Sequence, residues 1–372
     1  MREFFSKVDP WLFVPVLPIL FFGLVTMNSF EGSSQYFNHQ LIWIGIAFVV
    51  CFVLARMDLS ILRRGGFLLS LYVGIAALLL LLFALGHIAG GAQSWFSFGS
   101  FAFQPTDFAK IILIVVLAKY FSRRHVEIAH YKHILMSAGY TFFLFALIFF
   151  QPDFGSAMIL LFIWFGMILI SGISKKHLLI AFGLGIAVAG ILWFSILQPY
   201  QKARVLNFLH PYTDIQGSGY NAYQSTIAVG SGQLLGKGVG YGTQSRLQFL
   251  PEYQTDFIFA AFAEEWGFVG VLLLFISFGF LFYRLVDIAL RSGSNFELLT
   301  AVGVALYFMS HFIVNVGMNI GVLPVTGVTL PFMSYGGSHL IAEFAALGIV
   351  MNMGHNVRAT HRSEMKNELV GI

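Results

Sequence analysis

The chain has 372 residues, of which 58% are hydrophobic, 17% aromatic and only 10% charged, and its mean hydropathy is +0.81. Soluble domains contain roughly 45–50% apolar residues, so this composition excludes a soluble globular protein and predicts an integral membrane protein. The formal net charge is +4, but no basic motif with interleaved aromatic residues accompanies it. A nucleic-acid partner is therefore not expected.

Apolar runs long enough to cross a bilayer, about 17–25 residues each, occur ten times along the chain. The predicted spans are 12–29, 38–55, 66–86, 105–121, 134–150, 155–173, 178–197, 258–283, 298–320 and 338–354. The expected fold class is an all-α polytopic membrane protein with about ten transmembrane helices, forming a single domain over residues 1–372. Cys51, the one cysteine, lies in the second span, so no disulfide can form within the chain.

Basic residues alternate between the two sides of the predicted bundle. Sixteen of the 21 Lys and Arg residues lie at the amino terminus, in even-numbered connections or in the carboxy-terminal tail. Because cytoplasmic loops retain Lys and Arg, both termini are expected to be cytoplasmic. The long seventh connection, residues 198–256, is then an extracytoplasmic loop. Arg2 and Lys7 precede the first span without a small-residue cleavage site, which predicts an uncleaved first helix.

Three segments on the predicted outer side cannot continue a membrane helix, because they are rich in Gly, Pro or polar residues. They are 86–105, 198–256 and 321–338. Unpaired backbone is costly in lipid, so these segments must be buried in protein or line an aqueous cavity. The middle of the long loop, near 226–229, is mildly apolar and is expected to pack back on the helices. The three segments can converge on one cleft.

Motifs for cofactor binding are missing from the sequence. The stretch SGQLLGKG in the long loop resembles a phosphate-binding loop, but Ser231 replaces its first glycine and Gly238 its metal-binding Ser or Thr. The eleven histidines show no paired metal-ligand spacing. We therefore predict no organic cofactor and no zinc site, and the sequence leaves any other metal site unknown.

Charged residues inside spans are few, and each costs roughly 2.5–3.5 kcal/mol at a helix centre on insertion scales. Asp107 and Lys110 are three residues apart, so they can pair on one helical face, either as a structural pair or as part of a functional site. Asp153 lies in a tight turn, where capping is favoured over chemistry. Glu343 is a lone acid in the last span, and its role is open.

The stretch FLPEYQTDFIFAAFAEEWG, residues 249–267, places four acids beside an apolar run. In a helix that starts near Asp256, Glu264 lies about 80° and Glu265 about 180° around the axis, so neither shares the face of Asp256. Asp256 lies where the long loop meets the eighth span, a position that suits a general base reached from water. Capping of that helix by Thr255 or Asp256 is the alternative.

Longer motifs resemble those of a known family. They are GAQSWF at 91–96, FQPTDFAK at 103–110, QPDFGSA at 151–157, GSGYNAYQSTIAVGSG at 217–232, GKGVGYGTQSRLQFLPEYQTDFIFAAFAEEWGFVG at 236–270 and LPVTGVTLPFMSYGGS at 323–338. Their order over essentially the whole chain resembles the SEDS family (shape, elongation, division and sporulation). The GKG and GTQS elements and the short tail resemble its rod-shape branch more than its division branch.

This resemblance implies a multi-pass peptidoglycan glycosyltransferase of the bacterial cytoplasmic (inner) membrane. Such a protein polymerises lipid II on the outer face of the membrane, for cell-wall elongation and rod-shape maintenance. The partners implied are a class B penicillin-binding transpeptidase, the elongation machinery, undecaprenyl-linked glycan and membrane lipids.

The resemblance also assigns site residues. The family's catalytic aspartate falls on Asp256. The residues expected to bind substrate are Arg204, Lys110, Asp107, Ser334, Gly336, Gly337, Ser338 and Glu252. Three positions depart from the family pattern, which usually has Glu at Asp107, His at Gln254 and Gly at Gln233. The shorter acid reaches one methylene less far, and no imidazole can act at position 254.

The implied chemistry requires deprotonation of an acceptor hydroxyl and departure of a lipid diphosphate. A diphosphate is already a good leaving group, so Asp256 as base suffices without a second carboxylic acid. Arg204, Lys110 or a divalent cation, Mg or Mn, would meet the developing negative charge. Three alternatives stay open: a lipid II flippase, a septal polymerase of the division branch, and a scaffold for the transpeptidase. Polar groups gathered on the outer side rather than at the midplane favour the polymerase over the flippase.

Overall fold

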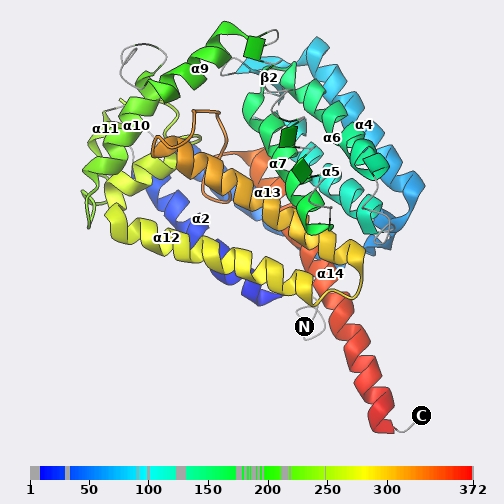
Figure 1. Ribbon diagram of the computed structural model, residues 1–372. Coiled ribbons are helices and arrows are strands. Elements are labelled where there is room, and N and C mark those ends of the chain that lie inside the picture. Colours follow the sequence, from blue (N-terminus) through cyan, green and yellow to red (C-terminus); the bar gives the residue numbers. More distant parts are fainter. Residues whose placement is uncertain are drawn as a thin grey trace.

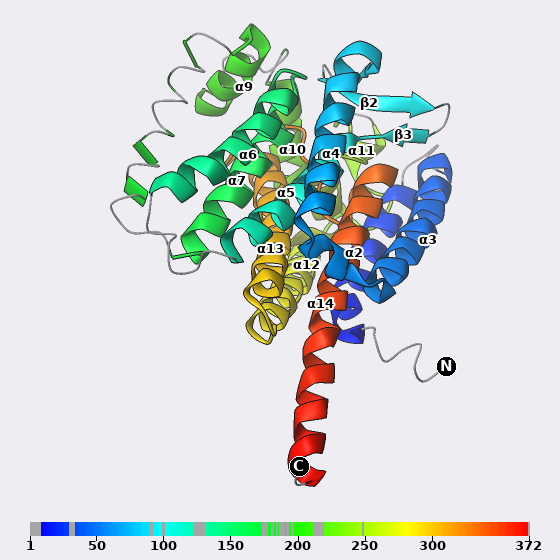
Figure 2. The same cartoon turned by 90° about the vertical axis from the view of Figure 1, so that its right-hand side faces the viewer.

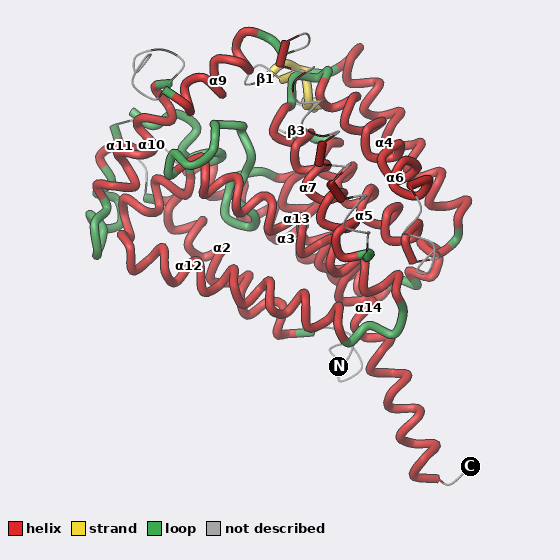
Figure 3. Tube along the Cα trace, in the orientation of Figure 1, coloured by secondary structure: helices red, strands yellow, loops and turns green. Residues whose placement is uncertain are grey.

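The computed structural model of the chain is dominated by helices (Figures 1 and 3). It describes residues 9–29, 34–89, 92–98, 101–122, 131–172, 197–210, 219–247 and 249–370, together with a few isolated positions between 178 and 217.

Helices among the described residues coincide with nine of the ten predicted spans. They are α2 (Pro10–Asn28), α3 (Ser34–Arg56), α4 (Gly65–Leu85), α5 (Pro105–Ser122), α6 (Tyr131–Phe149), α7 (Phe154–Ile170), α12 (Ile258–Leu290), α13 (Asn295–Asn319) and α14 (Gly337–Val370). In the described part of the chain, six of them are apolar and long enough to cross a membrane: α2, α3, α4, α6, α12 and α13. The predicted span 178–197 lies largely outside the described residues, so the count of ten stays a prediction.

Capping side chains determine where several helices begin. Asp9 accepts the N–H of Trp11 at 3.1 Å, and Pro10 follows it at the first position of α2, where its missing N–H costs nothing. Ser294 caps α13 by accepting the N–H of Glu297. The carboxylate of Glu297 in turn pairs with Arg63, which follows α3 in the chain. Arg63 belongs to one of the basic connections that are predicted from the sequence to lie on the cytoplasmic side.

Small residues allow several helices to approach closely. A Cβ on Gly348 of α14 would lie 2.6 Å from the carbonyl oxygen of Cys51 in α3, and one on Gly303 of α13 would lie 2.4 Å from Cγ2 of Ile114 in α5. Close contact of this kind is typical of membrane helices, because lipid tails are as apolar as a protein core and burial alone does not bring helices together. Buried apolar side chains from all nine helices form one connected core.

The first outer segment, predicted to be irregular, contains three short strands. Strands β1 (His87–Ala89), β2 (Ala92–Phe98) and β3 (Phe101–Phe103) form an antiparallel sheet with β2 in the centre. The predicted all-α fold class therefore has one small sheet added to it. The hydrogen bonds between its strands satisfy the backbone of a segment that cannot continue a membrane helix. The sheet packs beside α4 and α5.

The long connection 198–256 contains helices of its own. They are α9 (Pro199–Leu209), α10 (Tyr220–Ser231) and α11 (Thr243–Arg246). Helix α10 packs on α12 and α13, which confirms that the apolar middle of the loop folds back. Figures 1 and 2 show these helices and β2 at one end of the molecule, opposite the tail of α14. That this end is extracytoplasmic stays a prediction.

Candidate active site

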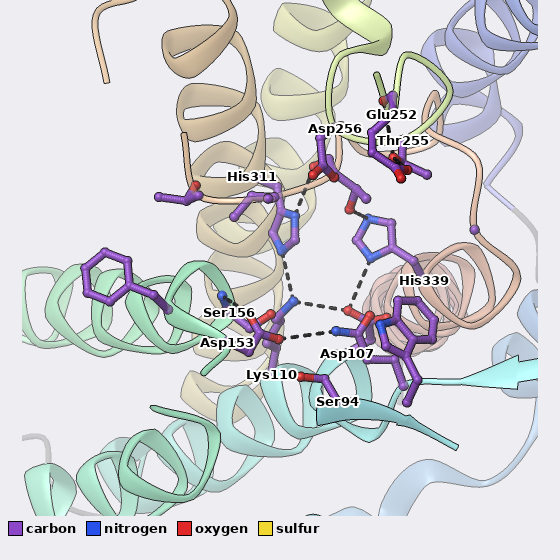
Figure 4. Close-up of a pocket in the computed structure, with 18 of the residues that line it drawn as sticks. Ser94, Asp107, Lys110, Asp153, Ser156, Glu252, Thr255, Asp256, His311 and His339 are labelled. Carbon is purple, nitrogen blue, oxygen red and sulfur yellow. Dashed lines mark hydrogen bonds and ion pairs between the residues drawn. The ribbon is translucent and has the colours of Figure 1, made fainter. Parts of the chain in front are cut away.

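A cavity of about 300 Å³ lies at the end of the bundle that carries β2 and α9 (Figure 4). Residues of all three outer segments line it, so the convergence predicted from the sequence is confirmed. Its lining includes Ser94, Trp95 and Gln104 from the first segment, Arg204, Glu252, Thr255 and Asp256 from the second, and Thr326, Gly327, Val328, Thr329, Tyr335 and Gly336 from the third. Asp107, Lys110, Asp153, Ser156, His311 and His339 complete its polar surface.

Asp256 is held at the cavity by its backbone. Its carbonyl oxygen accepts hydrogen bonds from the side-chain amides of Asn315 at 2.9 Å and Asn319 at 3.1 Å, both on α13. Phe257 occupies the capping position of α12, and no side chain caps that helix. The capping alternative for Thr255 and Asp256 is therefore wrong. The carboxylate of Asp256 lies at the cavity instead (Figure 4).

The surroundings of Asp256 favour the neutral form of its carboxyl group. Burial and the negative charges of Glu252 and Asp153 raise its pKa to about 7, while the guanidinium of Arg204 acts in the opposite direction. Gly327, at φ +74°, lies beside this carboxylate, and a Cβ there would be in van der Waals contact with Oδ2 of Asp256 at 3.4 Å. A carboxylate that ionises near neutral pH can take up a proton and release it again, as a general base must.

Asp107 and Lys110 form the predicted pair at another wall of the cavity. Nζ of Lys110 lies 3.1 Å from Oδ1 of Asp107, and both side chains are buried. The acid is one methylene shorter than the family pattern, and it still reaches the lysine. Lys110 also contacts Nε2 of His311 at 3.4 Å, and Oδ1 of Asp107 lies 3.3 Å from Nδ1 of His339. The pair is thus part of a larger polar cluster.

Arg204 and Glu252 come from the long connection, and both line the cavity as predicted. Arg204 lies on α9. Glu252 lies in the turn before α12, where its carboxylate accepts a hydrogen bond from the hydroxyl of Thr255 at 3.1 Å. Their charges change the pKa of Asp256 in opposite directions. Arg204 and Lys110 are the arginine and the lysine that line the cavity, and both carry positive charge.

Of the predicted Ser and Gly residues at 334–338, most lie outside the cavity lining and contact the segments that form it. Gly336 belongs to the lining. The hydroxyl of Ser334 donates to the carbonyl of Thr255 at 2.7 Å, and that of Ser338 accepts the N–H of Gln104 at 3.2 Å. Gly337 packs on Trp43, where a Cβ would lie 2.5 Å from the indole ring. Direct binding of substrate by Ser334, Gly337 and Ser338 stays a prediction.

Asp153 acts as the predicted cap. Its Oδ1 accepts the N–H of Ser156 in the first turn of α7 at 3.0 Å. Its Oδ2 accepts a hydrogen bond from the side chain of Gln104 at 3.3 Å. The same carboxylate therefore joins α7 to the end of the sheet segment.

Four polar residues of the site were not singled out by the sequence: Asn315, Asn319, His311 and His339. All four are buried in α13 or α14. The two asparagines are four residues apart and so share a helical face, which was a usable signal. The histidines have no motif spacing, and only the packing of α5, α13 and α14 brings them to Asp107 and Lys110.

Glu264 and Glu265 lie outside the cavity lining and serve a different purpose. Both are fully buried under the turns that precede and follow α11. They hold these turns against α12, and Gly267, at φ +64°, interrupts the helix just after them. Their donors are Ser231, Lys237, Thr243, Gln244 and Ser245 for Glu264, and Ser29 and Gly240 for Glu265.

Among the described residues, no group of three His, Cys, Asp or Glu side chains could hold a metal ion. A divalent cation at this cavity would therefore need most of its ligands from outside this set of side chains.

Comparison with known proteins places the chain among membrane proteins of the cell cycle. The family model for cell cycle proteins of the FtsW, RodA and SpoVE type matches residues 8–359. The peptidoglycan glycosyltransferase MrdB of Escherichia coli (strain K12) is 36% identical over 371 residues, which cover 99% of this chain and 98% of that protein. Stage V sporulation protein E of Bacillus subtilis (strain 168) is 33% identical over 365 residues, covering 95% and 99%.

Solved structures agree over almost the same length. A chain from a structure described as "Structural coordination of polymerization and crosslinking by a peptidoglycan synthase complex" matches with a TM-score of 0.81 and 32% identity, covering 94% of this chain and 98% of that one. The crystal structure of the rod shape determining protein RodA of Thermus thermophilus matches with a TM-score of 0.71 and 30% identity, covering 94% and 97%.

Proposed function

This chain belongs to the FtsW, RodA and SpoVE family of cell cycle proteins, the SEDS family, and we propose that it polymerises lipid II into peptidoglycan strands during cell-wall elongation. It is a glycosyltransferase, and its multi-pass helical fold matches RodA. One observation supports the location of the chemistry above the others. Asp256, a carboxylate with a pKa of about 7, lies at a cavity that also contains Lys110 and Arg204.

In the proposed reaction, Asp256 acts as general base. The ionised carboxylate takes the proton of the acceptor sugar hydroxyl, whose oxygen forms a bond to the anomeric carbon of the donor. The bond from that carbon to the diphosphate oxygen breaks, and its electron pair leaves with the lipid diphosphate. Because this leaving group is stable as an anion, no side chain has to protonate it.

Lys110 and Arg204 would stabilise the negative charge that grows on the departing diphosphate. Lys110 is a point charge held in place by Asp107, and Arg204 offers a planar fork that suits phosphate oxygens. Mg²⁺ or Mn²⁺ could share this task by binding diphosphate oxygens, water and one or two cavity carboxylates. The reaction needs no organic cofactor, because the donor is already activated.

We assign this activity to the outer face of the bacterial inner membrane, with a class B penicillin-binding transpeptidase as partner. The convergence of the three outer segments on the cavity, at the end opposite the tail of α14, supports the assignment to the outer face. The similarity to a chain of a peptidoglycan synthase complex supports the partner. The polymerising protein and the transpeptidase would then act on the same glycan strand, together with the elongation machinery.

The test is glycan synthesis from labelled lipid II by the purified full-length chain with its transpeptidase, resolved as ladders on a gel. Ladders are the expected result. Bound lipid II without ladders would contradict the proposal, and translocation of labelled lipid II across vesicles by the same preparation would identify a flippase. Ladders with a transpeptidase of septal division, but not with one of elongation, would contradict the elongation role.

A further inference from the structure

Beside the cavity, five residues from α5, α13, α14 and the third outer segment form a closed ring of contacts (Figure 4). Lys110 contacts Asp107 at 3.1 Å and His311 at 3.4 Å. His311 Nδ1 lies 3.2 Å from the carbonyl of Thr329, whose hydroxyl lies 2.7 Å from His339 Nε2. His339 Nδ1 returns to Oδ1 of Asp107 at 3.3 Å. A closed ring restrains each member from two sides.

The partners of His311 determine its tautomer. A backbone carbonyl can only accept, so Nδ1 of His311 carries the hydrogen that is donated to Thr329. An ammonium group can only donate, so Nε2 of His311 accepts from Lys110. His311 is therefore a neutral imidazole, and it orients Lys110 without adding charge.

His339 has the opposite set of partners. Its Nδ1 faces the carboxylate of Asp107, and its Nε2 lies 2.8 Å from Oε1 of Glu343. Negative charge on two sides of the ring favours its imidazolium form, in which Nε2 can also donate to the hydroxyl of Thr329. The charges of Lys110 and His339 then balance those of Asp107 and Glu343, which is required of a buried cluster in a membrane protein.

Glu343 connects this cluster to the segment that carries Asp256. Its Oε2 accepts the N–H of Phe332 at 2.9 Å, and Phe332 has φ +61°, a left-handed backbone that non-glycine residues seldom adopt. Two residues later, the hydroxyl of Ser334 donates to the carbonyl of Thr255, next to Asp256. The pair of Glu343 and His339 thus restrains both the Lys110 wall and the Asp256 wall.

We propose that His339, held as an imidazolium by Glu343, is a positioning residue that fixes Asp107 and thereby aims the Lys110 ammonium at the diphosphate of the substrate. This inference rests on the proposed function, because it assigns Lys110 to that diphosphate. If His339 is replaced, the carboxylate of Asp107 keeps only its contact with Lys110 among the described residues and can change orientation. The ammonium of Lys110 then loses its fixed direction. His339 acts only through Lys110 and does not itself contact the reacting atoms.

Binding of fluorescent lipid II to the full-length protein is measured in the Asp256→Asn background, where turnover is about a thousandfold slower. The kcat is measured in the background that keeps Asp256. The variants are His339→Gln, Lys110→Ala and the two combined. His339→Gln should weaken binding and lower kcat about tenfold, the usual size of a lost hydrogen bond to a charged group. In the Lys110→Ala background the same change should have no further effect. An equal loss in both backgrounds, or no loss in either, overturns the proposal.

A second variant separates positioning from folding. His339→Gln leaves Glu343 buried without its counter-charge, so the melting temperature should fall. His339→Gln combined with Glu343→Gln restores the balance of charge, and should recover the melting temperature but not lipid II binding. Recovery of both would reduce His339 to a structural role. His39→Gln, at an exposed position near the start of α3, is the matched histidine control and should change neither quantity.

The binding measurement also keeps the two proposals apart. If the wild type binds lipid II but forms no glycan, the proposed function fails, while the comparison of binding with and without Lys110 still decides the role of His339.

Discussion

Two acids eight residues apart show how surroundings give the same chemical group different tasks. Glu264 is fully buried and accepts hydrogen bonds from Lys237 and from backbone and side-chain groups of the turns around α11. Asp256 lies at the cavity, where the neighbouring Glu252 and Asp153 add negative charge. Many donors stabilise an ionised carboxylate, whereas burial with like charges makes it bind a proton more readily. The first arrangement builds structure, and the second suits proton transfer.

Removal of the carboxylate of Asp256 should have the largest effect on the rate of glycan synthesis. Asp256→Asn keeps size and shape and should lower the rate of glycan synthesis by about a thousandfold, within the usual range for a general base. The melting temperature at pH 7 should not fall, because the backbone contacts of Asp256 to Asn315 and Asn319 persist. Gel ladders and thermal unfolding check both. A rate within tenfold of the wild type would exclude Asp256 as the base.

The structural acid should show the reverse pattern. Glu264→Gln removes the ion pair with Lys237 and turns one acceptor into a donor that faces other donors, so it should cost about 3 kcal/mol of stability. The fall in melting temperature measures this cost. Glu252→Gln, at an exposed position, is the control and should melt like the wild type. An unchanged melting temperature for Glu264→Gln would mean that the turns around α11 are held by other contacts.

Straining the backbone that contacts the carboxylate should have a smaller effect. Gly327→Ala places a Cβ 3.4 Å from Oδ2 of Asp256 and costs about 1 kcal/mol because of its positive φ. The rate of glycan synthesis should fall several-fold. Gly321→Ala is the matched control, because it has a similar φ of +76° but contacts Thr226 instead of Asp256. It should share the loss of stability and keep the rate, and equal rates in both variants would contradict the assigned geometry.

The smallest predicted effects are shifts in pH dependence. Glu252→Gln removes a negative charge that raises the pKa of Asp256, so the rising limb of the rate profile should move to lower pH. Arg204→Gln removes a positive charge that lowers this pKa, so it should move the limb to higher pH and also reduce the rate. Rate profiles of the three proteins check the directions. A shift of both variants in the same direction would contradict the assigned charges.

The sequence could predict what depends on local pattern. Apolar length identified the spans, and Gly and Pro content identified the three segments that meet at the cavity. The spacing of three between Asp107 and Lys110 was enough to predict their pairing, because both residues lie on one helix.

Contacts between distant helices could not be predicted in this way. Asn315 and Asn319 reach the backbone of Asp256 only because α13 packs beside the start of α12. His339 meets Asp107 across more than two hundred residues of chain. The role of Glu343 stayed open in the sequence because its partner Phe332 depends on how the third outer segment folds over α14, although its other partner, His339, lies one turn away on the same helix.

The measurement that tests the central claim most directly is the rate of glycan synthesis by the wild type between pH 5 and pH 9. Because Asp256 must be ionised to accept a proton, the rate should rise about tenfold per pH unit and level off above about pH 7. The raised pKa also means that stability from the neutral carboxyl is present at low pH and lost as the pH rises through 7, and Asp256→Asn should abolish this loss. A rate that is flat from pH 5 to pH 9 would contradict the account.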